Sequence, residues 1–266
     1  MNRLLALLIL TLLCIPSAFA TQGSLNVLTE EWGPITFEEN GKAQGFAVDV
    51  VEAIQAQIKN DAHIQVVPWT RGYHEVQSHP NVVLFTVIRS KEREKLFTLL
   101  GPLGGCEISF YGLVRPNLKI KNIDDAKNLP AIAANQDTLF ATLLQSSGFN
   151  NIIMTKNPQQ EVQLLVAGRV DLITNDPVAI ETAFKKMGRS DLRLKKYLTL
   201  EKSELYIAFS KGTPYPVMQQ WKKGLEEIKQ NGTFAKIVHK WLPDSQVLPG
   251  TQLVGLESEN PSRAKN

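Results

Sequence analysis

Residues 84–97 read LFTVIRSKEREKLF, a nearly unbroken apolar segment that runs directly into a charged one. The run from Val82 to Val87 is too continuously apolar for a half-exposed strand and is typical of a parallel strand buried on both faces. Ser90 is a favoured N-cap residue, so a helix is predicted to begin directly after it. The glutamates on either side of Arg93 suit the positive end of the helix dipole, whereas Arg93 opposes it. An anion bound beyond the helix end would explain that cation, so the junction predicts an anion site.

Segments with strand and helix patterns alternate along the rest of the chain, which indicates parallel sheets with crossover helices. The first group of predicted elements contains a strand at 25–29, a helix with one apolar face at 46–58, and strands at 64–67 and 82–87. The second group contains a strand at 131–134, a helix at 138–147, a helix that begins at Asn157 and Pro158, a strand at 170–174, and a helix from Asp176 to Gly188. The C-terminal third returns to a strand at 205–209 and two helices, the second capped at Thr233.

The first twenty residues are typical of a cleavable signal peptide. A basic start and an apolar core precede the small-x-small cleavage site at residues 18–20. The core is shorter than the roughly 20 apolar residues of a membrane span, so we expect a soluble mature chain in the periplasm. Leu13 stands before Cys14 where a lipoprotein needs a small residue, so we expect no lipid anchor. Cleavage leaves Cys106 as the remaining cysteine and excludes an intramolecular disulfide.

Composition excludes several classes of function. The full chain carries 29 Lys and Arg against 26 Asp and Glu, a balance that gives no support for a nucleic-acid partner. The four histidines include no pair at the i, i+4 spacing of a metal site. No phosphate-binding loop, dinucleotide fingerprint or nucleophile elbow is present. We therefore expect neither a metal nor another cofactor.

Two motifs resemble those of the family 3 periplasmic solute-binding proteins, which include the polar amino-acid receptors of ABC importers. In that family a strand is followed by Thr-x-x-Arg, whose Arg takes the ligand α-carboxylate; here Ser90 replaces the Thr and Arg93 keeps the Arg. Thr86 matches an upstream ligand-contacting Ser. Residues 168–176, GRVDLITND, are similar to the family motif whose final Asp takes the ligand ammonium group. The resemblance implies that Arg93 and Asp176, on different lobes, hold the two charges of a zwitterion.

Both residues also have a purely structural interpretation. An ion pair with a nearby carboxylate such as Glu94 would account for Arg93 without any ligand. Asp176 would serve as the N-cap of the helix that Pro177 begins. A side chain at the carboxyl end of a parallel strand can both cap a helix and bind a ligand, because such sheets bind ligands at that edge.

Other positions follow the family less closely. Trp32 resembles an aromatic residue that covers the ligand, and Thr138 is retained from a Gly-Thr-Thr segment that binds the carboxylate. Asp137 replaces a Thr of that segment and would put a negative charge beside the carboxylate. Arg71 and Arg89 are further cations near the mouth of the first lobe. A solvated face would explain both, whereas an inward orientation would indicate a second acid group on the ligand.

The resemblance covers about residues 24–242 and implies an α/β, type II periplasmic-binding-protein fold. Each of its two lobes is a mainly parallel sheet flanked by helices, and the chain crosses between them twice, near 106–110 and 201–206. The expected division is a signal peptide at 1–20, lobe 1 at 21–107 and 204–242, lobe 2 at 108–203, and a loose tail at 243–266.

The function implied is periplasmic binding of an amino acid or a related carboxylate by closure of the two lobes. We expect a monomer that delivers its ligand to an inner-membrane ABC permease, or alternatively signals to a membrane sensor. An enzymatic alternative remains, because periplasmic cyclohexadienyl dehydratases resemble these receptors throughout. Their chemistry needs an acid with a raised pKa in the cleft, for which the sequence offers Asp137, Glu107 and Glu201. The lack of a nucleophile or metal motif favours binding without turnover.

Overall fold

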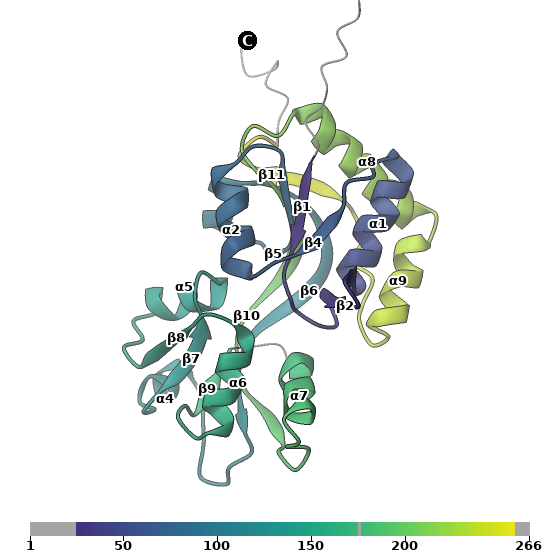
Figure 1. Cartoon of the computed structure of the whole chain (residues 1–266). Helices are drawn as coiled ribbons and strands as arrows, with labels where there is room; N and C mark the ends of the chain where they lie inside the picture. The colour runs from purple at the N-terminus through teal and green to yellow at the C-terminus, as the bar shows by residue number, and fades with distance from the viewer. Residues whose placement is uncertain (1–24, 175–176, 259–266) are drawn as a thin grey trace, which may run out of the picture.

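The long strands β6 (Thr98–Leu113) and β10 (Leu194–Phe209) connect the two lobes of the molecule (Figure 1). The computed structural model describes residues 25–174 and 177–258. The strands pair antiparallel from Thr98 opposite Phe209 to Leu113 opposite Leu194. The main sheet has the order β4-β1-β5-β10-β6-β9-β7-β8, so one hydrogen-bonded sheet runs through both lobes. Its middle is therefore the connection between them.

The first lobe is built on the parallel strands β1 (Asn26–Thr29), β4 (Ile64–Val66) and β5 (Val82–Ile88). Every residue of β5 is buried, which confirms the prediction of a strand covered on both faces. One face is covered by α1 (Phe46–Ile58), α8 (Tyr215–Gln230) and α9 (Thr233–Trp241). The other face packs against α2 (Trp69–Ser78) and Phe97, which follows the short helix α3 (Lys91–Leu96). A hairpin of β2 (Phe37–Glu39) and β3 (Lys42–Gln44) precedes α1.

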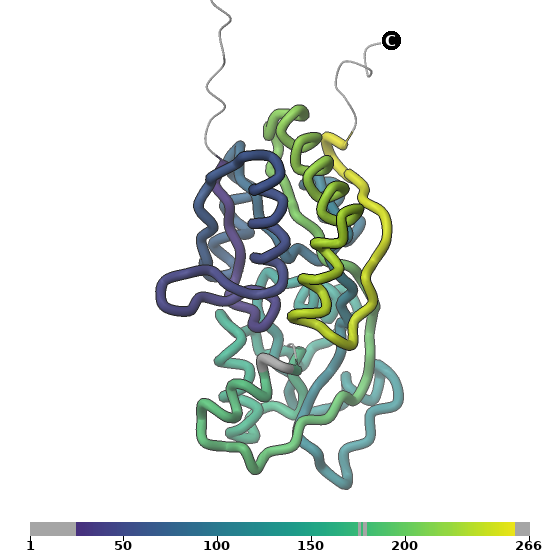
Figure 2. Tube along the Cα trace, turned by 90° about the vertical axis from the view of Figure 1, so that its right-hand side faces the viewer, coloured from purple at the N-terminus to yellow at the C-terminus, as the bar shows by residue number. Residues whose placement is uncertain are grey.

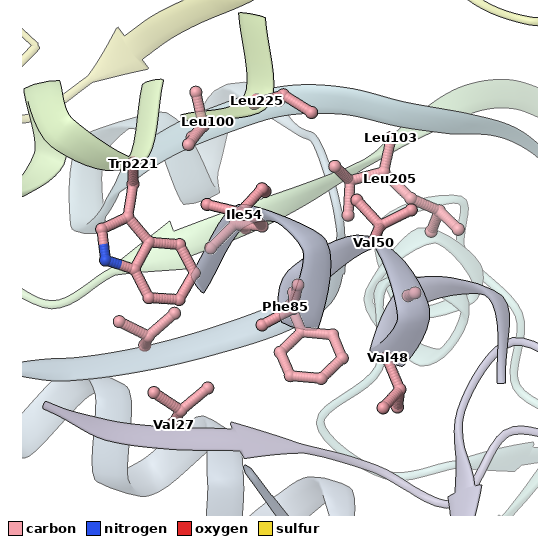
Figure 3. Packing of buried hydrophobic residues seen from close by; sticks show 14 of the residues in the cluster. Val27, Val48, Val50, Ile54, Phe85, Leu100, Leu103, Leu205, Trp221 and Leu225 are labelled. Atoms are coloured by element: carbon pink, nitrogen blue, oxygen red, sulfur yellow. The ribbon is translucent and has the colours of Figure 1, made fainter. Parts of the chain in front are cut away.

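The larger core of this lobe lies between the sheet and α1 and α8. In Figure 3 side chains from β1, α1, β5, β6, β10 and α8 converge on one apolar region. Trp221 of α8 is fully buried there and meets Phe209 edge-to-face, with ring centroids 5.7 Å apart. Burial of a large side chain contributes roughly 1.5–3 kcal/mol, so this packing stabilises the lobe without a disulfide.

The second lobe repeats the plan on a smaller scale. β7 (Ile132–Asn135) lies parallel to β8 (Ile152–Thr155) and β9 (Leu172–Ile173). α4 (Ile123–Lys127) and α5 (Leu139–Ser146) pack on one face, and α6 (Pro158–Val166) and α7 (Pro177–Lys186) on the other. Each lobe thus combines parallel strands with antiparallel segments of β6 and β10.

The helix caps follow the sequence at some positions and not at others. Ser90 caps α3 by accepting a hydrogen bond from the Arg93 amide at 3.2 Å, as predicted. Asn157 caps α6 by accepting from the Gln160 amide at 3.0 Å, also as predicted. The prediction for Thr233 was wrong, because Gly232 occupies the cap position and Thr233 is already helical.

Two further segments differ from the sequence-based expectation. The predicted strand at 205–209 is only the end of β10, whose earlier half carries many charged residues and lacks an apolar run. The segment after Trp241 is not a loose tail, because β11 (Gln252–Gly255) pairs antiparallel with β6 in the first lobe. Leu253 and Val254 pack against the cores on opposite faces of the sheet. β11 covers backbone groups of β6 that would otherwise form an open edge.

Figure 2 shows the same chain from the side, with the C-terminal segment in yellow returning along the first lobe. None of the described helices is long and apolar enough to cross a membrane. The predicted signal peptide at 1–20 and Asp176 lie outside the described residues.

Candidate ligand-binding site

The carboxyl ends of parallel strands from both lobes meet at one cavity. Glu30 follows β1, Thr86 and Ile88 lie in β5, Asn135 ends β7 and Thr174 follows β9, and all of them line the cavity. Parallel α/β sheets bind ligands at this edge. The volume of the cavity is about 70 Å³, whereas a single water molecule needs about 10–15 Å³ of such volume. The room therefore suits a small molecule.

Arg93 is the buried cation of the cavity, with 5% of its surface exposed. Its guanidinium carbon lies 5.2 Å from the ring centroids of both Trp69 and Tyr73, and Nη1 donates to the Ile88 carbonyl at 2.9 Å. Burial lowers its pKa, and contact with Tyr73 and the nearby Glu30 opposes that shift. A guanidinium carries five donors, so it can also hold a planar anion.

Glu94, the carboxylate named as a structural partner for Arg93, does not pair with it. Glu94 pairs with Arg89 instead, with Oε1 2.6 Å from Nε. Within the described part of the chain, Arg93 forms no ion pair with a carboxylate at or below 4.0 Å. Among the described residues, Glu30 is the carboxyl group whose charge raises the pKa of Arg93. A buried cation is costly unless it is paired, so this arrangement calls for an anion.

Glu30 is the titratable group that sequence reasoning missed. Burial raises its pKa to about 8, and the charge of Arg93 partly opposes that shift. The carboxyl group is therefore mostly protonated at pH 7 and can either donate a hydrogen bond or lose its proton to face a cation. The available signal was its place directly after the first predicted strand, the position from which such sheets bind ligands.

Several other polar groups reach the cavity. The side-chain oxygens Asn135 Oδ1 and Thr174 Oγ1 are buried and have no hydrogen-bond partner among the described residues. Glu161 of α6 is 1% exposed and also lines the cavity. Leaving a buried polar group unsatisfied costs about 1–3 kcal/mol, so a bound polar ligand or water would satisfy the oxygens of Asn135 and Thr174.

Thr86 lies at a bulge of β5 inside the cavity. Val87 faces Tyr206 and Phe85 faces Ile207 on β10, so Thr86 has no opposite residue in the ladder. Its φ of 71° is rare for a β-branched residue. Its hydroxyl donates to the Phe85 carbonyl. Strained backbone of this kind persists where the surrounding structure enforces it, often at ligand sites.

Two tryptophans and Thr138 also line the cavity. Trp32 is half-buried and lines the cavity, and Trp69, which is buried, lines it as well. Thr138 also lines it, but its hydroxyl caps α5 by accepting from the Ala141 amide at 3.2 Å and donates to the Asn135 carbonyl at 2.6 Å. That hydroxyl is already engaged within the protein.

The remaining predicted residues lie away from the cavity lining or outside the described chain. Arg71 is exposed on α2, and Arg89 is held by Glu94 and the Tyr206 hydroxyl. Asp137 is exposed, although its backbone carbonyl accepts from Trp69 Nε1 at 2.8 Å and so joins the lobes. Asp176 is outside the described residues.

The acids suggested for an enzymatic role are not at the cavity. Glu107 pairs with Lys196 at 2.7 Å and Lys202 at 3.4 Å. Glu201 and Asp137 are exposed. Burial raises the pKa of the Cys106 thiol to about 12, which leaves it protonated and unreactive. The described residues contain no group of three or more His, Cys, Asp or Glu side chains that could hold a metal ion.

Comparisons with known proteins point to one family. The family model of bacterial extracellular solute-binding proteins, family 3, matches residues 25–244. The chain is similar to the L-cystine-binding protein TcyA of Bacillus subtilis (strain 168), with 24% identity over 223 residues, 83% of this chain and 81% of that protein.

Solved structures show the same fold. The chain resembles a histidine kinase sensor domain with similarity to periplasmic binding proteins, with a TM-score of 0.74, 18% identity, and 83% of this chain and 97% of that one covered. It also resembles an ancestral amino acid-binding protein described as a precursor of cyclohexadienyl dehydratase, with a TM-score of 0.68, 21% identity, and coverage of 82% and 95%. The predicted type II periplasmic-binding-protein fold is confirmed.

Proposed function

Because this chain belongs to the bacterial extracellular solute-binding proteins of family 3, we propose that it binds an amino acid or a related small carboxylate between its lobes. The observation that carries the proposal is Arg93, a buried cation that lines the cavity without an ion-pair partner among the described residues. A ligand carboxylate would supply the missing anion in bidentate geometry.

Acids on both sides of the cavity support a ligand that also carries an amine. Glu30 comes from the first lobe and Glu161 from the second, and both line the cavity that Arg93 enters. Asp176, predicted to take the ammonium group, would add a third acid from the second lobe. A cation-binding group opposite an anion-binding group defines a zwitterion, so an amino acid fits better than a simple dicarboxylate.

Closure of the lobes is the proposed response to binding. The Trp69 to Asp137 hydrogen bond already joins the first lobe to the second beside the cavity. A ligand held by groups from both lobes favours the form in which they lie close together. Rotation about the strands β6 and β10 would separate the lobes for release.

The proposed partner is an inner-membrane ABC permease, to which the chain would deliver its ligand from the periplasm. The predicted signal peptide and a curated relative that is a cystine-binding protein support this assignment. A membrane sensor is the second candidate, supported by the likeness to a histidine kinase sensor domain. A dehydratase is the third, and its general acid would be Glu30, whose pKa of about 8 keeps a proton available in the cavity.

A thermal-shift screen of the mature chain tests the proposal. The probes are the amino acids, cystine, dicarboxylates, polyamines and prephenate. A ligand at 100 times its dissociation constant adds about 2.7 kcal/mol, which raises the melting temperature by roughly 5 to 11 °C for a chain of this size. The proposal fails if no amino acid or carboxylate shifts the transition. Steady consumption of prephenate, abolished by Glu30→Gln, would establish the enzymatic candidate.

A further inference from the structure

The chain continues past the region that matches the family. The family match ends at residue 244, but residues 245–258 form a C-terminal strap on the first lobe. Its strand β11 pairs with β6, with Gln252 opposite Gly101 and Gly255 opposite Thr98 (Figure 1). The strap is also tied to α8, because Lys229 Nζ donates to the Gly250 carbonyl at 2.6 Å.

The end of the strap lies directly on the C-terminal end of α3. The Leu256 amide donates to the Phe97 carbonyl at 3.0 Å, and the Glu257 amide donates to Thr98 Oγ1 at 3.0 Å. Gly255 has φ of 97°, and a Cβ atom there would lie 2.3 Å from the Phe97 carbonyl oxygen and 2.8 Å from that of Glu94. The backbone of the strap therefore contacts the backbone at the end of α3 at a position where only glycine fits.

A second route reaches α3 through side chains. Gln252 Nε2 donates to the Tyr206 hydroxyl at 2.6 Å, and Arg89 Nη1 donates to the same oxygen at 3.2 Å. Arg89 Nε in turn donates to Glu94 of α3 at 2.6 Å. Both routes end on the helix that carries Arg93 in its first turn.

We propose that the C-terminal strap is a positioning element of the binding site, which holds α3 so that Arg93 stays aimed at the cavity. A helix of six residues has little stability of its own and takes its position from what packs against it. Bidentate recognition of a carboxylate tolerates errors of only about 0.5 Å, so a small shift of α3 weakens binding. The inference rests on the proposed role of Arg93.

The decisive variant is Gly255→Ala, and the matched control is Gly250→Ala. Gly250 lies in the same strap with φ of 72°, but a Cβ atom there meets no described atom within 4 Å. Both glycines have positive φ, so both variants strain the backbone, but only an alanine at 255 collides with α3 and Phe97. Each glycine variant is made in the parent chain and in Arg93→Ala. Calorimetry with the best ligand of the screen then measures the affinity of every combination.

In the parent chain we expect Gly255→Ala to weaken binding about tenfold and Gly250→Ala less than twofold. In Arg93→Ala, the Gly255 change should cause no further loss, because the group that it misplaces is gone. Equal losses in both backgrounds, or an unchanged affinity in the parent chain, would overturn the proposal. Gln252→Ala, which removes only the side-chain route, gives a milder version if Gly255→Ala fails to fold.

A measurement without ligand separates this inference from the proposed function. The Arg93 Nε–H signal in a nitrogen-15 spectrum should be protected from solvent exchange in the parent chain and in Gly250→Ala. It should shift and lose protection in Gly255→Ala. An unchanged Arg93 signal in Gly255→Ala would refute the positioning role even if no ligand were found.

Discussion

The first and second lobes contribute different chemistry to the cavity between them. The first lobe supplies Arg93 as the buried cation and Glu30 as an acid with a raised pKa, together with the aromatic rings that flank the guanidinium. The second supplies side-chain oxygens of Asn135 and Thr174 that have no hydrogen-bond partner in the described part of the chain. A ligand carboxylate can therefore be held by the first lobe alone, whereas a ligand that spans the gap can also satisfy the oxygens of the second. We therefore expect contacts from the first lobe to set the affinity for a carboxylate and contacts from the second lobe to favour closure.

The largest expected effect is the loss of Arg93. Arg93→Ala would leave a ligand carboxylate desolvated and unpaired, which costs about 2 to 5 kcal/mol, or more than tenfold in affinity. Isothermal titration with the best ligand measures it. Arg71→Ala, at an exposed site on α2, is the control and should retain full affinity. Unchanged binding in Arg93→Ala would refute the carboxylate assignment.

The matching test on the second lobe is Asp176→Asn. For an amino acid we expect a loss similar to that of Arg93→Ala, because the ammonium group loses its counter-charge. For a ligand without an amine the affinity should hardly change. Asn keeps an oxygen that can cap a helix, so a loss reports on binding rather than folding. Comparing titrations of an amino acid and its deaminated analogue measures the difference, and equal losses for both would contradict the zwitterion.

Glu30 should make stability depend on pH. Its pKa is about 8 in the folded chain against 4.5 in the unfolded chain, so between these values the folded state holds a proton that the unfolded state has lost. Stability contributed by this group is full below pH 4.5 and declines as pH rises toward 8. Melting curves from pH 4.5 to 8.5 should show this decline in the parent chain and less of it in Glu30→Gln.

Glu39, which is exposed on β2 and does not line the cavity, provides the control for that comparison. Glu39→Gln should follow the parent chain across the same pH range. The pH dependence of affinity also distinguishes ligand classes. A ligand whose ammonium group faces Glu30 should bind better as pH rises and Glu30 ionises. A ligand whose carboxylate accepts a hydrogen bond from protonated Glu30 should bind worse. A decline of stability that is the same in Glu30→Gln would show that another group causes it.

The smallest expected effect concerns Thr138. Its hydroxyl caps α5, so Thr138→Ala should cost about 0.5–2 kcal/mol of stability. Because the same hydroxyl already donates to the Asn135 carbonyl, ligand affinity should fall much less. Urea denaturation and titration measure the two quantities, with Thr138→Ser as the variant that keeps the cap. A large loss of affinity without a loss of stability would assign the hydroxyl to the ligand.

Local signals explain why much of the fold was predictable. Ser90 and Asn157 cap their helices as expected, because an N-cap depends on residues within one turn. The buried strand β5 was also predictable, because burial on both faces demands a continuous apolar run. The first half of β10 and the strand β11 carry no such run. Both pair with β6, which is distant from them in the sequence, so no local pattern marked them as strands.

The sequence by itself determined the junction between β5 and α3 and the placement of Arg93 in its first turn, because strand burial and capping are set by near neighbours. Tertiary structure decided what Arg93 faces. The approach of the lobes brings Asn135 of the second lobe to the cavity that Glu30 of the first lobe lines. Packing within the first lobe places Trp69 of α2 against the guanidinium and pairs Arg89 with Glu94. Which polar groups share a cavity depends on contacts between residues far apart in the chain, and no local pattern of side chains records those contacts.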